Sequence, residues 1–186
     1  MSQILTCVRL ALLIAMLGTL SACVAPAHMV PDQALLPSVS PDSPFREAIA
    51  ISKVGGGEKM GFLLISKVSS DDLQEALRLS LKQYGFLGTP DLAAPFRLEV
   101  FLIELIQPAG GFTMIVYSVI RYRLTRSSDD QMVYDDIITA SDRATMDDSL
   151  LGHQRMKIAT ERAIRANIVA FLEHLHSLDI PPSPIQ

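Results

Sequence analysis

The hydrophobic and polar positions divide the chain into an apolar start, a proline-rich segment and a longer periodic region. The apolar run "LALLIAMLGTL" covers residues 10–20. Five prolines follow within residues 24–44, and proline both breaks helices and stiffens an extended chain. We therefore expect residues 23–44 to form a tether, residues 45–178 to form one domain, and residues 179–186, "DIPPSPIQ", to be a flexible tail.

The periodic region predicts strands and helices in the order β-β-α-β-β-β-α. Patterns typical of strands cover residues 45–54, 61–68, 96–106, 112–124 and 132–140, and helical patterns follow residue 69 and span about 150–178. Ser69 or Ser70 is the expected N-cap of the first helix. Asp71 and Asp72 favour its positive end, and Gly85 ends it. This order predicts an α+β fold, a two-layer sandwich in which two helices pack on one face of an antiparallel sheet.

The segments 96–106 and 112–124 alternate between apolar and polar residues and predict a hairpin around the turn "QPAGG". Successive side chains of a strand point to opposite faces, so one set of them should lie beneath the helices. This inner set consists of Phe96, Leu98, Val100, Leu102, Phe112, Met114, Val116, Ile120, Tyr122 and Leu124.

The opposite face of this hairpin is polar at one end and apolar near the turn. The polar end is formed by Arg97, Glu99, Arg121 and Arg123. A register with Glu99 opposite Arg121 would pair opposite charges, and it sets Phe101 beside Val119. The apolar part is a candidate interface made of Phe101, Ile103, Leu105, Ile115, Tyr117 and Val119. Because an uncovered sheet face is usually polar, the patch indicates a partner or lipid surface, or else cover by the tether, another loop or the first hairpin.

The composition argues against nucleic acid as a partner. The chain has 186 residues, a formal net charge of −4 and 6% aromatic residues. Nucleic-acid binding needs concentrated positive charge, and binding of single strands also needs aromatic side chains on which bases stack. Apolar residues make up 49% of the chain, which is ample for a compact core.

No stretch of the sequence predicts a catalytic or metal site. The stretch "GGGEK" lacks the spacing of a phosphate-binding loop, and no nucleophile elbow is present. His174 and His176 are two residues apart on a helix, which points them to different sides, so we expect structural roles. The aspartates between residues 129 and 148 lack calcium-loop spacing, and a weak cation site is their remaining alternative. We therefore predict a protein that is not an enzyme, with no catalytic residue and no metal.

The apolar run closes on "LSAC", which places small residues directly before Cys23. A membrane span needs about 20 apolar residues, so a run of eleven is short for a span and suits a signal sequence. The segment Leu20-Ser21-Ala22-Cys23 resembles the lipobox of bacterial lipoproteins. The resemblance implies removal of a signal peptide, residues 1–22, and a thioether-linked diacylglycerol with an N-acyl chain on Cys23. No other cofactor is expected, and the alternative is an uncleaved anchor helix in which Cys23 has no role.

The residue after the cysteine bears on location. In lipoproteins of this kind, an aspartate there tends to retain the protein at the inner membrane, and this chain has Val24. The resemblance therefore implies a lipid anchor in the outer membrane, with the domain facing the periplasm.

The strand and helix order, together with the helix "RMKIATERAIRANIVAFLEHL", is similar to that of small envelope lipoproteins. These include YajG-type and transporter-auxiliary lipoproteins. The likeness by itself assigns no function. It carries over no site residue except Cys23. The first hypothesis, which rests on the apolar outer face of the sheet, is a non-catalytic binding or accessory module of a cell-envelope complex, with an envelope protein docked on that face. A carrier or sensor of lipid or another amphiphile is the alternative, and a periplasmic hydrolase is a third hypothesis.

Overall fold

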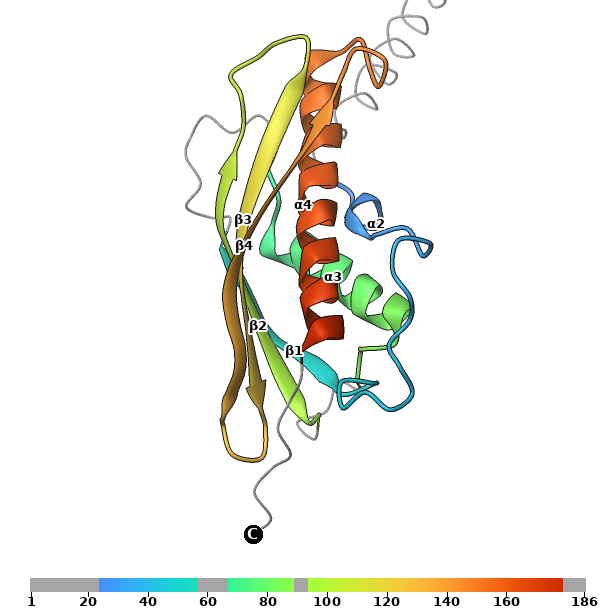
Figure 1. The fold of residues 1–186 in the computed structure, drawn as a ribbon. Coiled ribbons are helices and arrows are strands. Elements are labelled where there is room, and N and C mark those ends of the chain that lie inside the picture. Colours follow the sequence, from blue (N-terminus) through green and yellow to red (C-terminus); the bar gives the residue numbers. More distant parts are fainter. Residues whose placement is uncertain (1–23, 57–66, 89–93, 179–186) are drawn as a thin grey trace, which may run out of the picture.

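A four-stranded sheet and two long helices form the two layers of the molecule (Figure 1). The structure is a computed structural model, and it describes residues 24–56, 67–88 and 94–178. The strands follow chain order across the sheet: β1 (Ile49–Gly56), β2 (Phe96–Ile106), β3 (Met114–Arg126) and β4 (Met132–Ala144). The predicted α+β sandwich is confirmed.

The sheet is mixed, whereas the sequence predicts an antiparallel one. β1 runs parallel to β2, while β2, β3 and β4 are antiparallel to their neighbours. Parallel neighbours need a crossover connection, and the helix between β1 and β2 supplies one. The predicted strand at 61–68 falls almost entirely outside the described residues, as do the signal peptide, Cys23 and the tail.

The two long helices, α3 (Ser70–Tyr84) and α4 (Gly152–Ser177), lie on the same side of the sheet (Figure 1). The predicted cap of α3 is confirmed, because the Ser69 hydroxyl accepts a hydrogen bond from the Asp72 backbone N–H at 3.0 Å. Gly85 ends the helix with a left-handed φ of 82°, a conformation that glycine adopts without steric cost.

The hydrophobic core lies between the helices and the inner face of the sheet. The residues of β2 and β3 expected on this face are buried, and Phe171 of α4 stacks on Tyr122 with ring centroids 4.1 Å apart. Phe112 is the exception, with 78% of its surface exposed. The prediction for this residue is wrong because β3 begins only at Met114, which leaves Phe112 in the connection before the strand.

Residues 24–44, which the sequence predicts to be a tether, pack on the helix layer instead. They include a short helix, α2 (Pro26–Met29), that contacts both α3 and α4 (Figure 1). Val24 is buried, and the Tyr84 hydroxyl of α3 donates a hydrogen bond to the Asp32 carbonyl at 2.7 Å. The packed part of the chain therefore begins at Val24 rather than near residue 45.

A buried carboxylate of α4 holds the start of this segment. Glu161 accepts a hydrogen bond from the Ala25 backbone N–H at 2.8 Å and contacts His28 Nδ1 at 3.1 Å. The Arg165 guanidinium also donates to the His28 carbonyl at 3.0 Å. Pro26 does not prevent α2, because proline is tolerated at the first helical position, where its missing N–H is not needed.

Candidate functional site

The face of the sheet turned away from the helices carries the exposed apolar side chains expected from the alternation of β2 and β3. Phe101, Ile103, Ile115 and Tyr117 are each between 43% and 51% exposed, and Val119 is half-buried. Ile106 lies on the same face and is 46% exposed. We call this set the apolar patch: Phe101, Ile103, Ile106, Ile115, Tyr117 and Val119.

Leu105 does not belong to the patch, although the sequence places it there. It is 4% exposed and lies in the core. The reason is a bulge in β2 between Leu102 and Glu104, which shifts the alternation by one residue. Beyond the bulge Leu105 points inward and Ile106 points outward, and the plain alternation of apolar residues gives no signal of that shift.

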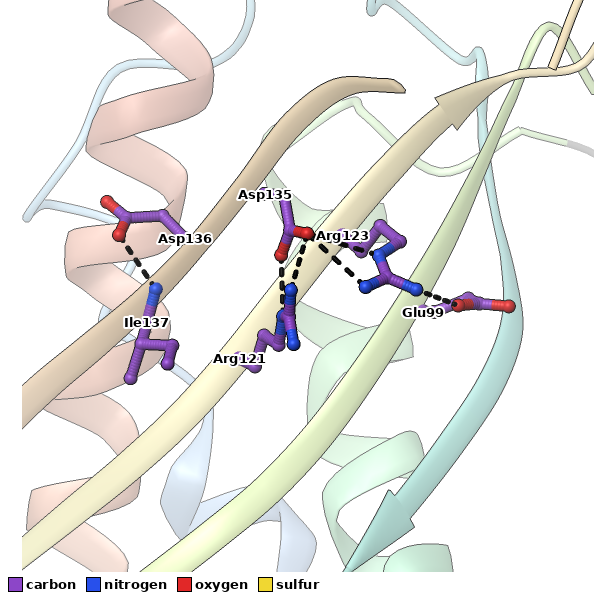
Figure 2. A network of polar contacts seen from close by, with 6 residues as sticks. All are labelled: Glu99, Arg121, Arg123, Asp135, Asp136 and Ile137. Atoms are coloured by element: carbon purple, nitrogen blue, oxygen red, sulfur yellow. Dashed lines mark hydrogen bonds and ion pairs between the residues drawn. The ribbon is translucent and has the colours of Figure 1, made fainter. Parts of the chain in front are cut away.

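A charged cluster borders the apolar patch, because Arg121 lies opposite Phe101 in the pairing of β2 with β3. Figure 2 shows the cluster, made of Glu99, Arg121, Arg123 and Asp135. Asp135 of β4 accepts hydrogen bonds from Arg121 Nε at 2.6 Å and from Arg121 Nη2 at 2.7 Å. Arg123 Nε lies 3.3 Å from the same carboxylate, and its Nη1 lies 3.7 Å from Glu99. The hydrogen bonds from Arg121 hold the pKa of Asp135 below its usual range. The Asp135 carboxylate therefore remains ionised near neutral pH.

The pairing of β2 with β3 differs from the predicted register by two residues. Glu99 lies opposite Arg123 rather than Arg121, and Phe101 lies opposite Arg121 rather than Val119. The last pair between the two strands is Ile106 with Tyr117, so residues 107–116 separate the paired segments, and Met114, Ile115 and Val116 pair with β4 instead. The expected pairing of opposite charges is still made, through Glu99 and Arg123.

An open groove of about 400 Å³ lies where the apolar patch meets the charged cluster. It is lined by Lys53, Glu99, Val100, Phe101, Ile103, Arg121 and Arg123. Its walls include an aromatic ring and two guanidinium groups, which are side-chain types enriched at protein interfaces, together with aliphatic side chains and the charged Lys53 and Glu99. The groove suits the binding of a partner's side chain.

A second open groove, of about 780 Å³, lies between β1 and α3. Its lining includes Arg78, which is already paired with Glu75 at 2.7 Å, and the carboxylate Glu47. Its apolar residues, Ala50, Ile51 and Leu87, are fewer and smaller than those of the apolar patch. The outer sheet face is therefore the stronger candidate for binding.

The layer between α4 and the sheet, where the carrier hypothesis would place an amphiphile, is filled by side chains. Ile164, Ile168 and Phe171 of α4 have no exposed surface and pack on Val116, Ile120 and Tyr122 of the core. This packing disfavours the carrier hypothesis.

His174 and His176 of α4 make structural contacts, as the sequence predicts. His174 Nδ1 is hydrogen-bonded to the Tyr134 hydroxyl at 2.6 Å, and the His176 ring contacts Phe86 edge-on. Burial raises the pKa of Tyr134 to about 12, so its hydroxyl stays protonated. Within residues 24–56, 67–88 and 94–178, no group of three or more potential ligands is placed to hold a metal ion. None of the helices in this part of the chain is long and apolar enough to cross a membrane.

Comparison with known proteins supports the fold. No protein family model matches the chain, and no curated protein is significantly similar to it in sequence. Among solved structures, the chain is similar to protein XCC0632 of Xanthomonas campestris, from the family DUF330. The TM-score is 0.54, at 11% identity, over 77% of this chain and 92% of that chain.

Two further structures have lower scores. The hypothetical protein CT253 of Chlamydia trachomatis has a TM-score of 0.49 and 16% identity, over 70% of this chain and 97% of that one. A minor lipoprotein of Acinetobacter baumannii has a TM-score of 0.44 and 12% identity, over 69% and 93%. At identities this low a structural likeness shows the fold alone, so any function must be argued from the residues of this chain.

Proposed function

We propose that this protein is a lipid-anchored envelope protein that binds a protein partner through its outer sheet face. Cys23 supplies the anchor, because the motif Leu20-Ser21-Ala22-Cys23 follows an apolar run of signal-sequence length. Val24 after the cysteine favours the outer membrane, with the domain on the periplasmic side. In this proposal the protein is an accessory module of an envelope complex rather than an enzyme.

The observation that carries the binding role is the apolar patch on a face that residues 24–44 do not cover. A covering tether was one alternative explanation for so many apolar side chains on this face. The structure places that segment against α3 and α4, on the opposite side of the sheet. Another alternative is that the first predicted hairpin covers this face. That hairpin includes residues 57–66, which lie outside the described part of the chain.

The composition of the face points to a protein as the partner. Phe101 and Tyr117 are large, rigid aromatic side chains of the patch, and the arginines Arg121, opposite Phe101, and Arg123 stand at its border. Interfaces draw most of their binding energy from such aromatic and arginine side chains at a desolvated centre. The paired charges of the cluster would fix the orientation of the partner rather than add much affinity.

Replacing both Ile103 and Tyr117 by glutamate tests the proposal. The two side chains are 43% exposed, so the charges stay solvated in the free protein and the fold should be kept. Each charge would have to be buried without a partner in the complex, which strongly opposes binding. We expect the natural protein to retain a stoichiometric partner through affinity purification from solubilised envelopes, and the double variant to lose it.

Leu35→Glu is the matched control. Leu35 is 55% exposed and lies in the segment packed on the helix side, so this charge should leave the partner bound. Circular dichroism and a thermal melt of each variant report on folding. Loss of the partner in the control as well, or a melting temperature much lower in the double variant, would refute the assignment of the interface.

A further inference from the structure

Three large apolar side chains project from one end of the molecule. Phe112 lies in the connection between β2 and β3, and Leu150 and Leu151 lie in the connection between β4 and α4. They are 78%, 78% and 57% exposed, respectively. Figure 1 shows both connections at the same end of the long axis, and we call them the end loops.

A buried arginine ties the end loops together. Arg155 is 6% exposed, and its Nη1 donates to the carbonyls of Ser149 and Leu150 at 2.8 and 2.9 Å. Its Nη2 donates to the carbonyl of Gly111 in the other loop at 3.0 Å. One guanidinium therefore holds the backbone next to Phe112 close to the backbone at Leu150, so the exposed side chains of both loops lie at the same end of the molecule.

A second set of contacts fixes the loop that carries the leucines. Asp148 accepts a hydrogen bond from Arg162 Nη2 at 2.6 Å and another from the Thr145 backbone N–H at 2.8 Å. These bonds lower the pKa of Asp148 to about 2, so its charge persists at neutral pH. The leucines are thus presented to the surroundings by an ordered loop.

The end loops lie close to the point where the lipid would be attached. Val24 is buried, and the Ala25 N–H is bonded to Glu161, six residues after Arg155 along α4. Six residues of helix span about 9 Å along the axis. Cys23 is one peptide bond before Val24. A lipid on the Cys23 sulfur would therefore be joined to this end of the domain without a flexible linker between them.

The opposite end of the molecule has a different character. The turn between β3 and β4, at the other end of the long axis, reads "SSDDQ" over residues 127–131, with Asp129 and Asp130 exposed (Figure 1). Asp129 and Asp130 are paired with Arg126 and Arg97, and the loop that carries the leucines has two exposed aspartates of its own, so acidic side chains do not distinguish the two ends. The difference lies in the exposed Phe and Leu side chains of the end loops, which favour the boundary between headgroups and acyl chains. The end loops are therefore the end of the long axis that is better suited to a membrane surface.

We propose that the end loops insert Phe112, Leu150 and Leu151 into the bilayer surface beside the lipid anchor. The inference rests on the proposed lipid attachment of Cys23. In this orientation the strands run roughly perpendicular to the membrane plane. The outer sheet face then points sideways, parallel to that plane. A partner anchored in the same membrane would then meet the apolar patch without crossing the periplasm.

The test measures the depth of single fluorescent labels in the membrane. The lipidated full chain is reconstituted into vesicles of phosphatidylethanolamine and phosphatidylglycerol. Because Cys7 is removed with the signal peptide and the sulfur of Cys23 is blocked, one introduced cysteine takes an NBD label specifically. The variants are Phe112→Cys and Leu150→Cys, with Met132→Cys as the control, since Met132 is 52% exposed and begins β4 beside the acidic turn.

We expect nitroxides on the lipid acyl chains to quench the labels at 112 and 150 several-fold more than the label at 132. If 112 and 150 stay unquenched while the protein remains on the vesicles, the insertion is refuted and the anchor stands. Two other results would also refute the insertion. One is equal quenching at all three positions. The other is a change in NBD fluorescence at 112 and 150 that depends on the density of protein on the vesicles rather than on the nitroxide. Release of every variant from the vesicles by washing would refute the lipid attachment itself, and the insertion with it.

Discussion

Replacing Cys23 by serine is expected to release the protein from the membrane completely. The proposed anchor is a thioether on the Cys23 sulfur, and a serine hydroxyl is a far weaker nucleophile than a thiolate near neutral pH. A single acyl chain binds a membrane only marginally, whereas two or three chains hold a protein stably. The variant should therefore lose its acyl chains and move from the membrane fraction to the soluble fraction.

Metabolic labelling with a palmitate analogue, followed by fractionation of the envelope, measures this effect. Cys7→Ser is the matched control, because Cys7 lies within the proposed signal peptide and should not affect labelling of the mature chain. Equal labelling of the natural chain and the Cys23→Ser variant would contradict the anchor. So would a label that depends on Cys7.

Asn167→Ala is expected to cause the second large effect, a loss of folding stability. The side-chain amide of Asn167 is fully buried between α4 and the sheet. Its Nδ2 donates to the Ile138 carbonyl at 2.8 Å and to the Ser118 carbonyl at 3.1 Å, and its Oδ1 accepts from the Tyr122 hydroxyl at 3.0 Å. Removing the amide leaves several buried polar groups unpaired, which should lower the free energy of unfolding by about 3 kcal/mol.

The urea midpoint of the purified protein, at an unchanged slope, reports this loss. Tyr122→Phe is the graded comparison, because it removes one hydroxyl from the same network and keeps the stacking on Phe171. It should cost less than the loss of Asn167. If Asn167→Ala were as stable as the natural chain, the network would not hold α4 on the sheet.

Local signals in the sequence account for the elements that were predicted correctly. The serine cap and Gly85 mark the two ends of α3, and both act within one turn of the helix. Alternation over β2 and β3 identifies the inner face up to Leu102 and the outer position of Phe101 and Ile103. Each of these features depends on residues close together in the chain.

The features that the sequence does not reveal depend on distant contacts or on irregular backbone. Residues 24–44 are held by Tyr84 and Glu161, which lie 52 and more than 130 positions away from the groups that they bind. No local sequence pattern indicates such distant pairs. The prolines favour an extended tether in the sequence-based prediction, but in the structure they are accommodated in loops and at the start of α2. The inward turn of Leu105 follows from a bulge without a glycine or proline to mark it.

The candidate site was predicted in outline only. Phe101, Ile103, Ile115 and Tyr117 share one exposed face, as alternation requires, and Ile106 takes the place of Leu105. The end loops were missed because the sequence places Phe112 on the inner face, and because their proximity depends on Arg155 joining two connections far apart in the chain.

The orientation of the domain connects the two proposals. A tether would have let the domain rotate freely above the bilayer, whereas the docked segment fixes it beside Cys23. With the end loops at the membrane, the apolar patch is presented to neighbours in the same membrane. The partner we expect is therefore an envelope protein with an apolar, sideways-facing surface close to the bilayer.

Photocrosslinking in living cells tests the central claim, that the outer sheet face binds a protein partner. A photoreactive amino acid at position 103 or 117 of the full chain, compared with one at position 35, reports what lies against each surface. We predict one crosslinked protein of defined mass at 103 and 117 that is absent at 35. Crosslinks at all three positions alike, or none at 103 and 117 while the protein is correctly anchored, would contradict the claim.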